Sequence, residues 1–391
     1  MRMIDDMAGD HAIHGWCDER FLAVRDAFAE VHLGRAGERE IGSMVAVYQG
    51  DDLVVDLWGG FRDASSTRPW ERDTIVLMMS VAKGISAMCT HMLIDRGVIE
   101  PDAPVARYWP EFAQNGKENV LVRHVLDHTA GLCYAENVPP GAVFEHSVMA
   151  EALARQEPAW RPGTRSGYHM LTQGFLLNEI FRRSDGRTLG TFLREELAGP
   201  LGADYAIGLG VSDLVRCAEF IPAVAGILDR DHMDPSTFLA RAWNGSPEGT
   251  DFSYYNSTRW RTVEIPSANG HGTSRGVARM YAAFASGGRL GGVRVISEAA
   301  VDRAIEESHN YVEVVMGRSY HQALGFLLDS PPIVTYGGRP HAFGHHGVGG
   351  SLGFGDRDTG IGFAYAPNRL HERIENGPRA RMLIDALWSC V

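Results

Sequence analysis

Two β-hairpin patterns lie near opposite ends of the chain, and they constrain its fold more than any other feature. Residues 43–60, "SMVAVYQGDDLVVDLWGG", contain two apolar, β-branched runs around a Gly-Asp-Asp turn. Residues 350–367, "GSLGFGDRDTGIGFAYAP", contain two more runs joined at Asp-Arg-Asp-Thr-Gly. The sequence between the two hairpins has mainly helical patterns. We therefore expect an α/β protein of the α+β type, with an antiparallel sheet built from both ends of the chain, flanked by helices, and an all-helical subdomain inserted in the middle.

Helical spacing of apolar side chains predicts the helices that accompany this sheet. The segment over residues 273–286 opens with a Thr or Ser cap. The predicted helices are residues 15–33, 121–127, 170–183, 188–197, 273–286 and roughly 374–388.

One further helix begins at an unusual pair of side chains. Residues 76–97 read "VLMMSVAKGISAMCTHMLIDRG", and Lys83 is one of only two lysines in the chain. On a helix, Lys83 lies on the same face as Ser80, near the free N–H groups of the helix start. An apolar setting lowers the pKa of a lysine by desolvation, and a neutral lysine can take the proton of a serine nucleophile. The same sequence is also compatible with a serine that caps the helix and a lysine on the protein surface.

A tyrosine follows a Pro-Gly-Thr turn in residues 160–174, "WRPGTRSGYHMLTQG". Tyr168 stands just before a predicted helix, where a nearby lysine can stabilise its phenolate and make it a base. The alternative is a partly buried tyrosine whose hydroxyl is satisfied by a neighbour.

A pair of histidines precedes a glycine-rich strand in residues 343–356, "FGHHGVGGSLGFGD". Glycines on a strand let a ligand approach the backbone closely. The backbone N–H groups after Gly347, together with that of Ser80, can form an oxyanion hole. We expect Gly347, Val348 and Gly349 to bind the oxyanion or the substrate; a strand with a tight bend is the plainer alternative.

Together these segments resemble the superfamily of serine β-lactamases and penicillin-binding proteins, and most closely its class C branch and the family VIII carboxylesterases. The resemblance covers roughly residues 20–385 and implies the β-lactamase/transpeptidase-like fold. The matching segments are Ser80-x-x-Lys83, Pro162-Gly163-Thr164 with Tyr168 and Gly174, His345-x-Gly347, "HTAGL" at 128–132 and "GTSRGVARMYAAFASGGRLGG" at 272–292.

The chain departs from the family pattern at two positions. The family's Tyr-x-Asn reads Tyr168-His169-Met170, and the lactamase lysine of the third motif is His345. In lactamases both groups hold the amide and carboxylate of a β-lactam. The resemblance therefore implies simple esters or amides as better substrates, with β-lactam cleavage as a weak side activity.

The predicted activity is that of a serine hydrolase that forms an acyl-enzyme, in the first place a carboxylesterase that acts on small esters. Ser80 attacks the carbonyl, Lys83 and Tyr168 share the role of base, and Tyr168, aided by His345, protonates the leaving group. Residues 1–391 then form one catalytic unit: 1–78 and 270–391 make the α/β subdomain, 79–269 the mainly helical one, and the active site lies between them. An amidase or D-amino-acid peptidase, an acyltransferase and an inactive binding relative are the alternatives.

Composition excludes several other classes of function. A net charge of −12 without a basic stripe argues against nucleic acid as a partner. Five widely spaced cysteines do not form a disulfide framework, so we expect reduced thiols and a cytoplasmic location. We expect no membrane span, no cofactor and no metal, and a small-molecule ester or amide as the only partner; the oligomeric state stays open.

Three other patterns look chemical but fit poorly. Gly349-Gly350-Ser351-Leu352-Gly353 is a literal Gly-x-Ser-x-Gly, but that motif needs a strand–turn–helix elbow and a hairpin follows here. Tyr254-Tyr255-Asn256 lacks a Pro-Gly-Thr lead. The third pattern, His11, His14 and Cys17, has no fourth metal ligand.

Overall fold

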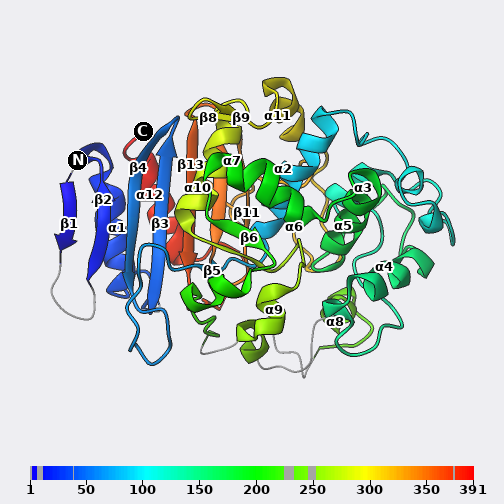
Figure 1. Ribbon diagram of the computed structural model, residues 1–391, viewed down its shortest axis with the longest axis horizontal. Coiled ribbons are helices and arrows are strands. Elements are labelled where there is room, and N and C mark those ends of the chain that lie inside the picture. Colours follow the sequence, from blue (N-terminus) through cyan, green and yellow to red (C-terminus); the bar gives the residue numbers. More distant parts are fainter. Residues whose placement is uncertain (1, 7–11, 38, 224–232, 245–251, 373–374) are drawn as a thin grey trace.

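The centre of the molecule is an eight-stranded antiparallel sheet whose strands come from both ends of the chain. A computed structural model describes residues 2–6, 12–37, 39–223, 233–244, 252–372 and 375–391. Figure 1 shows the blue N-terminal strands beside the orange and red C-terminal ones. The spatial order is β1 (Arg2–Asp6), β2 (Ile13–Cys17), β4 (Asp52–Gly60), β3 (Gly42–Gln49), β13 (Ile361–Pro367), β12 (Leu352–Asp356), β11 (Ala342–His346) and β10 (Leu327–Leu328). The two predicted hairpins, β3–β4 and β12–β13, are therefore confirmed, and β3 pairs directly with β13.

Helices cover both faces of this sheet. On β3, Val45 and Val47 pack into the same cluster as α1 (Leu22–His32) and α12 (Pro378–Trp388), whereas Met44 and Ala46 pack toward the opposite layer. Successive side chains of a strand point to opposite faces, so an apolar run such as β3 can fill two cores at once. The layer on the second face contains α10 (Ser274–Ala285), α2 (Val81–Asp95) and α11 (Glu298–Ala304).

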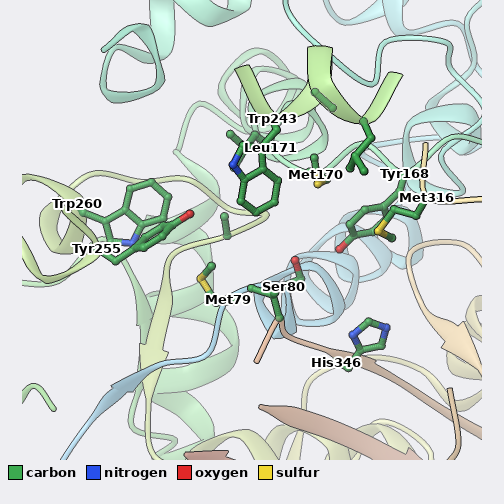
Figure 2. A pocket seen from close by; sticks show the side chains of 14 residues that line it. Met79, Ser80, Tyr168, Met170, Leu171, Trp243, Tyr255, Trp260, Met316 and His346 are labelled. Carbon is green, nitrogen blue, oxygen red and sulfur yellow. The ribbon is translucent and has the colours of Figure 1, made fainter. Parts of the chain in front are cut away.

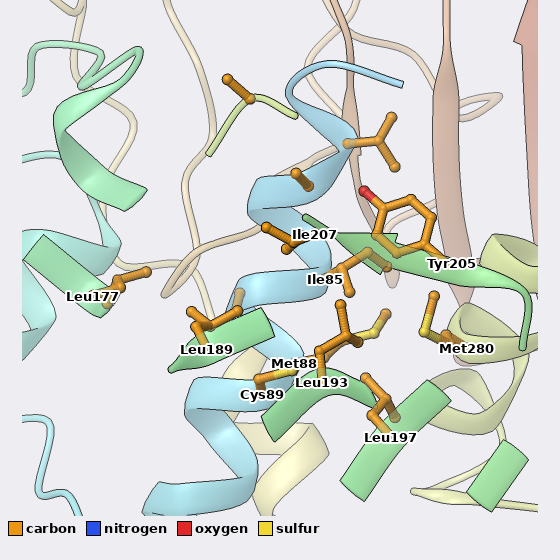
Figure 3. Packing of buried hydrophobic residues seen from close by; sticks show 14 of the residues in the cluster. Ile85, Met88, Cys89, Leu177, Leu189, Leu193, Leu197, Tyr205, Ile207 and Met280 are labelled. Carbon is orange, nitrogen blue, oxygen red and sulfur yellow. The ribbon is translucent and has the colours of Figure 1, made fainter. Parts of the chain in front are cut away.

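The helix α2 is buried on nearly all sides, which explains its apolar sequence. Figure 3 shows Ile85, Met88 and Cys89 among side chains from the π-helical turn η5 (Leu193–Ala198), the strand β6 (Tyr205–Ile207) and α10. A helix that is apolar all round is stable only inside such a core. The first turn of α2 is thereby held rigidly between the sheet and the middle of the chain.

The middle of the chain is mainly helical and lies to one side of the sheet (Figure 1). Its α-helices are α3 (Val122–Leu126), α4 (His146–Arg155), α5 (Thr172–Ser184), α6 (Leu189–Phe192), α7 (Gly199–Leu201), α8 (Phe238–Asn244) and α9 (Thr258–Thr262). Short 3-10 turns are η1 (Glu19–Phe21), η2 (Val105–Arg107), η3 (Pro110–Phe112), η4 (Ala142–Phe144), η6 (Val211–Arg216) and η8 (Phe252–Asn256). The small strands are β5 (Val76–Leu77) and β7 (Gly270–Gly272), which pair with each other beside β6, and β8 (Arg289–Leu290) with β9 (Val293–Arg294).

The helix predicted over residues 15–33 begins too early. Residues 13–17 form β2, which pairs with β1 on one side and with β4 on the other, and α1 starts only at Leu22. Pairing with two neighbouring strands satisfies the backbone of this segment in a way that local spacing does not reveal. The other predicted helices are close to their observed bounds, and α10 has the expected cap, because the Thr273 side chain accepts the Gly276 N–H.

The structure shows the state of the cysteines and the character of the helices. All five cysteines are free thiols, four of them buried. Over the described ranges, no helix combines the length and the apolar character needed to cross a bilayer.

Candidate active site

Ser80 stands at the N-terminus of α2 without acting as its cap. Its backbone occupies the N-cap position, but its side chain makes no capping hydrogen bond. The preceding residue, Met79, has a positive φ of 48°. A non-glycine residue in this region is strained, and such strain collects at functional sites. Ser80 is therefore not an ordinary N-cap serine.

Lys83 is buried directly beside Ser80. Only 2% of its surface is exposed, and its Nζ lies 3.2 Å from Ser80 Oγ. The same Nζ donates to the backbone carbonyls of Met170, at 2.7 Å, and Ser267, at 2.8 Å. Burial lowers the pKa of Lys83 well below its ordinary value, because a charged amine is poorly solvated here.

Tyr168 lies on the other side of Ser80. Its hydroxyl points toward the serine in Figure 2, and a hydrogen bond between the two side chains is present. Burial raises the pKa of Tyr168, and the Ser80 hydrogen bond opposes this only in part. Lys83 Nζ lies 4.7 Å from the centre of the tyrosine ring, over its face. Lys83 thus contacts the ring of Tyr168, while its hydrogen bonds go to Ser80 and two carbonyls.

The two neighbouring histidines of the third motif take different places. His345 is buried, stacks on the Tyr168 ring with centroids 6.1 Å apart, and uses Nδ1 to contact the His346 carbonyl at 2.7 Å. Burial lowers the pKa of His345 well below its ordinary value, so its ring is neutral. His346, which the sequence did not single out, lines the pocket instead. Successive side chains of a strand alternate, so only one of the two can face the cavity.

The turn after β11 brings backbone toward Ser80. At Gly347 an added Cβ would lie 2.3 Å from the Met78 carbonyl oxygen, so only glycine allows this approach. The Gly347 N–H donates to the Ser351 carbonyl at 2.7 Å and is therefore already engaged. Val348 lines the pocket, and Gly349 follows it with a φ of +85°. Of the three predicted positions, Val348 is the one that borders the cavity.

The pocket above Ser80 has mostly apolar walls (Figure 2). Two aromatic residues, Tyr255 and Trp260, form one end of it. The full lining is Met79, Ser80, Tyr168, Met170, Leu171, Leu239, Ala242, Trp243, Tyr255, Trp260, Ala268, Met316, His346 and Val348.

The competing patterns have structural roles. Ser351 is buried and donates its hydroxyl to the Met78 carbonyl at 2.8 Å, so it supports the start of the Ser80 turn. Asn256 bonds the backbone of Phe220 through its side chain. His14 and Cys17 lie on β2, and His11 lies outside the described residues. In the part of the chain that the structure describes, no group of three or more His, Cys, Asp or Glu side chains is arranged to hold a metal ion.

Several groups around Tyr168 were not identified from the sequence. His128 has a φ of 63°, and its backbone carbonyl accepts the Gly167 N–H. Its ring packs edge-on against that of Tyr168, with the ring centroids 4.9 Å apart. The buried carboxylate of Glu313 accepts the backbone N–H of Tyr168 at 2.9 Å. The "HTAGL" segment was the only available signal for His128, and Glu313 had none.

Comparisons with known proteins agree on one family. The family model described as beta-lactamase matches residues 29–386. The Esterase/beta-lactamase LipL of Mycobacterium tuberculosis is 36% identical over 365 residues, which cover 92% of this chain and 83% of that protein. A crystal structure of a family VIII carboxylesterase has a TM-score of 0.89 and 38% identity, covering 97% of this chain and all of that one. A penicillin-binding protein homologue from Caulobacter crescentus has a TM-score of 0.88 and 36% identity over 97% of this chain and all of that one.

Proposed function

Because the chain belongs to the beta-lactamase family, we propose that it is a serine hydrolase that forms an acyl-enzyme on Ser80 and acts as a carboxylesterase on small esters. The names of its relatives include esterases, and the predicted fold is the one found. The observation that carries the proposal is the set of hydrogen bonds around Lys83 Nζ.

These bonds match a neutral amine in its role as a base. A neutral amine has two N–H donors and one lone pair. The Met170 and Ser267 carbonyls can only accept, so they take the two donors. The lone pair then faces Ser80 Oγ, which among these three hydrogen-bond partners is the one able to supply a proton. Lys83 therefore removes the Ser80 proton as the oxygen attacks the carbonyl carbon of the ester.

The remaining steps use Tyr168 and the backbone. The raised pKa of Tyr168 keeps its hydroxyl protonated, so it serves as the acid that protonates the leaving alkoxide, and Lys83 supplies the replacement proton. The N–H groups of Ser80 and Val348 stabilise the oxyanion. In deacylation neutral Lys83 removes a proton from water as the water oxygen attacks the acyl carbon, and Lys83 returns this proton to Ser80 Oγ as the carboxylic acid is released.

The pocket walls favour an apolar substrate. Apart from Ser80, Tyr168 and His346, the lining is dominated by methionine, leucine, alanine and aromatic side chains. Met170 stands where lactamases have the asparagine that binds the amide of a β-lactam, and its carbonyl is occupied by Lys83. We therefore propose apolar or aromatic acyl or alcohol groups, and weak turnover of β-lactams.

The direct test is hydrolysis of p-nitrophenyl esters by Ser80→Ala. Removing the nucleophile abolishes the acyl-enzyme route, and we expect a loss of at least about 10³-fold in kcat. Ser330→Ala is the matched control, because this serine is also buried, donates its hydroxyl to the Leu328 carbonyl at 2.9 Å and lies outside the pocket lining. Mass spectrometry after treatment with a fluorophosphonate then locates the adduct. Retained turnover in Ser80→Ala, or an adduct elsewhere, would overturn the proposal.

A further inference from the structure

A buried carboxylate holds the backbone of Tyr168. Glu313 is 2% exposed, and its Oε2 accepts the N–H of Tyr168 at 2.9 Å and that of Val315 at 3.0 Å. Its Oε1 accepts the N–H of Met316 at 2.6 Å. Both oxygens therefore act as acceptors, and hydrogen bonds to a charged acceptor are stronger than neutral ones.

These bonds join two segments that are far apart in the sequence. Tyr168 and Glu313 are separated by 145 positions. A second link is made by the Val314 N–H, which donates to the Ser166 carbonyl at 2.9 Å. The Glu313 loop is itself closed by its own N–H, which donates to the Arg318 carbonyl at 2.8 Å. The carboxylate thus fixes the position of the tyrosine segment against a loop that has its own fixed shape.

Both segments also reach the cavity. Tyr168 and Met316, which flank the carboxylate in this network, line the pocket. They lie next to each other in Figure 2. Glu313 does not line the cavity, so it can act on the reaction only through the residues that it holds.

We propose that Glu313 is a positioning residue that keeps the Tyr168 hydroxyl where it can protonate the leaving alkoxide. This inference rests on the proposed function. The hydroxyl reaches Ser80 only if the backbone of Tyr168 is fixed, and Glu313 is the side chain that bonds the Tyr168 N–H. A catalytic group that is displaced by about 1 Å can lose about 10²-fold in rate.

The role predicts a dependence on the leaving group. An alkyl alcohol is a poor leaving group that needs protonation, whereas p-nitrophenolate leaves without it. Loss of Glu313 should therefore slow an ethyl ester far more than a p-nitrophenyl ester with the same acyl group. A residue that only supports the fold would lower both rates equally.

The experiment compares ethyl butanoate with p-nitrophenyl butanoate for the wild type, Glu313→Gln and Glu313→Ala. We expect Glu313→Ala to lower kcat/KM for the ethyl ester about 10²-fold more than for the p-nitrophenyl ester. Glu313→Gln should lose less of its kcat/KM for the ethyl ester, because an amide oxygen can still accept the Tyr168 N–H. This variant replaces Glu313→Ala in the test if the alanine variant does not fold. Asp63→Asn is the matched control: Asp63 is buried, accepts backbone N–H groups of Thr67 and Arg68, and lies outside the pocket lining.

A double-mutant cycle completes the test. In the Tyr168→Phe background the proton donor is already gone, so Glu313→Ala should add little to the loss on the ethyl ester. Equal losses on both esters, or the same additional loss without the tyrosine hydroxyl, would overturn this inference alone. A wild type without Ser80-dependent turnover of either ester would overturn the proposed function, and this inference with it.

Discussion

The chain has two lysines, and the structure buries both of them in similar surroundings. Lys83 is 2% exposed and donates to the carbonyls of Met170 and Ser267. Lys117 is fully buried and donates to the carbonyls of Gln114, at 2.8 Å, and Gln156. Each also lies over an aromatic ring, that of Tyr168 or that of Phe112.

The two sites differ in the third polar neighbour. Lys83 Nζ lies 3.2 Å from the hydroxyl of Ser80, which lines the pocket, whereas Lys117 donates to Gln114 and Gln156, which do not. Burial lowers the pKa of both, that of Lys117 to about 8 and that of Lys83 well below its ordinary value. A desolvated lysine bonded to carbonyls is therefore a structural element by itself, and it becomes a base only where its lone pair meets a proton donor.

The largest expected effect is the loss of activity when Lys83, the lysine beside Ser80, is replaced. Lys83→Met removes the base but keeps an unbranched side chain of similar length. We expect kcat for p-nitrophenyl butanoate to fall by about 10²–10⁴-fold, which is the usual contribution of a general base. Lys117→Met should leave kcat within about twofold, because the side chain of Lys117 donates to Gln114 and Gln156, which lie outside the pocket lining. Steady-state kinetics of both folded variants measure the difference, and equal losses would contradict it.

Local pattern predicted those parts of the molecule that short segments determine. Apolar runs on either side of a turn predicted both hairpins. Motifs at characteristic spacing predicted Ser80, Lys83 and Tyr168, which the fold brings together. The strand β2 was misassigned, because its pairing with β4 across about 40 residues leaves no local trace. Which histidine faces the pocket depended on the phase of β11, which the sequence alone does not fix.

The rest of the site was beyond sequence reasoning for a physical reason. Two of the three groups around Lys83 Nζ are backbone carbonyls, and every residue has one, so Met170 and Ser267 carry no signature. Glu313 acts through the N–H of a residue 145 positions away. Such contacts are products of the tertiary fold, and only the assembled structure shows them.

The pH dependence of the rate sharpens the comparison, because it reports which lysine must be neutral. The amine of Lys83 works as a base only when unprotonated, so kcat/KM should fall about tenfold per pH unit below its pKa. Since burial lowers that pKa well below the ordinary 10.5, activity should be retained near neutral pH. Kinetics from pH 5 to 10 on p-nitrophenyl butanoate measure this profile.

The control for this profile is Lys117→Met, which should keep the same acidic limb. The buried histidines beside Tyr168 do not interfere near neutral pH, because burial also lowers the pKa of His128 and His345 well below its ordinary value. A rate that rose only as the pH approached the ordinary lysine value would contradict the assignment of Lys83 as the base.

The smallest expected effect concerns stability at the other lysine. Lys117→Met removes the side-chain donor of the Gln156 carbonyl and leaves the Gln114 carbonyl only the backbone N–H of residue 117, which should lower the free energy of unfolding by about 1–3 kcal/mol. The loss should depend on pH. The folded pKa of about 8 lies below the unfolded value of 10.5, so between these values the unfolded chain binds more protons and the wild-type stability rises with pH. The difference between wild type and variant should therefore grow by about 1 kcal/mol between pH 8 and pH 9. Urea unfolding of both proteins at these two pH values measures it, and a constant difference would show that Lys117 is charged in the folded state as it is in the unfolded one.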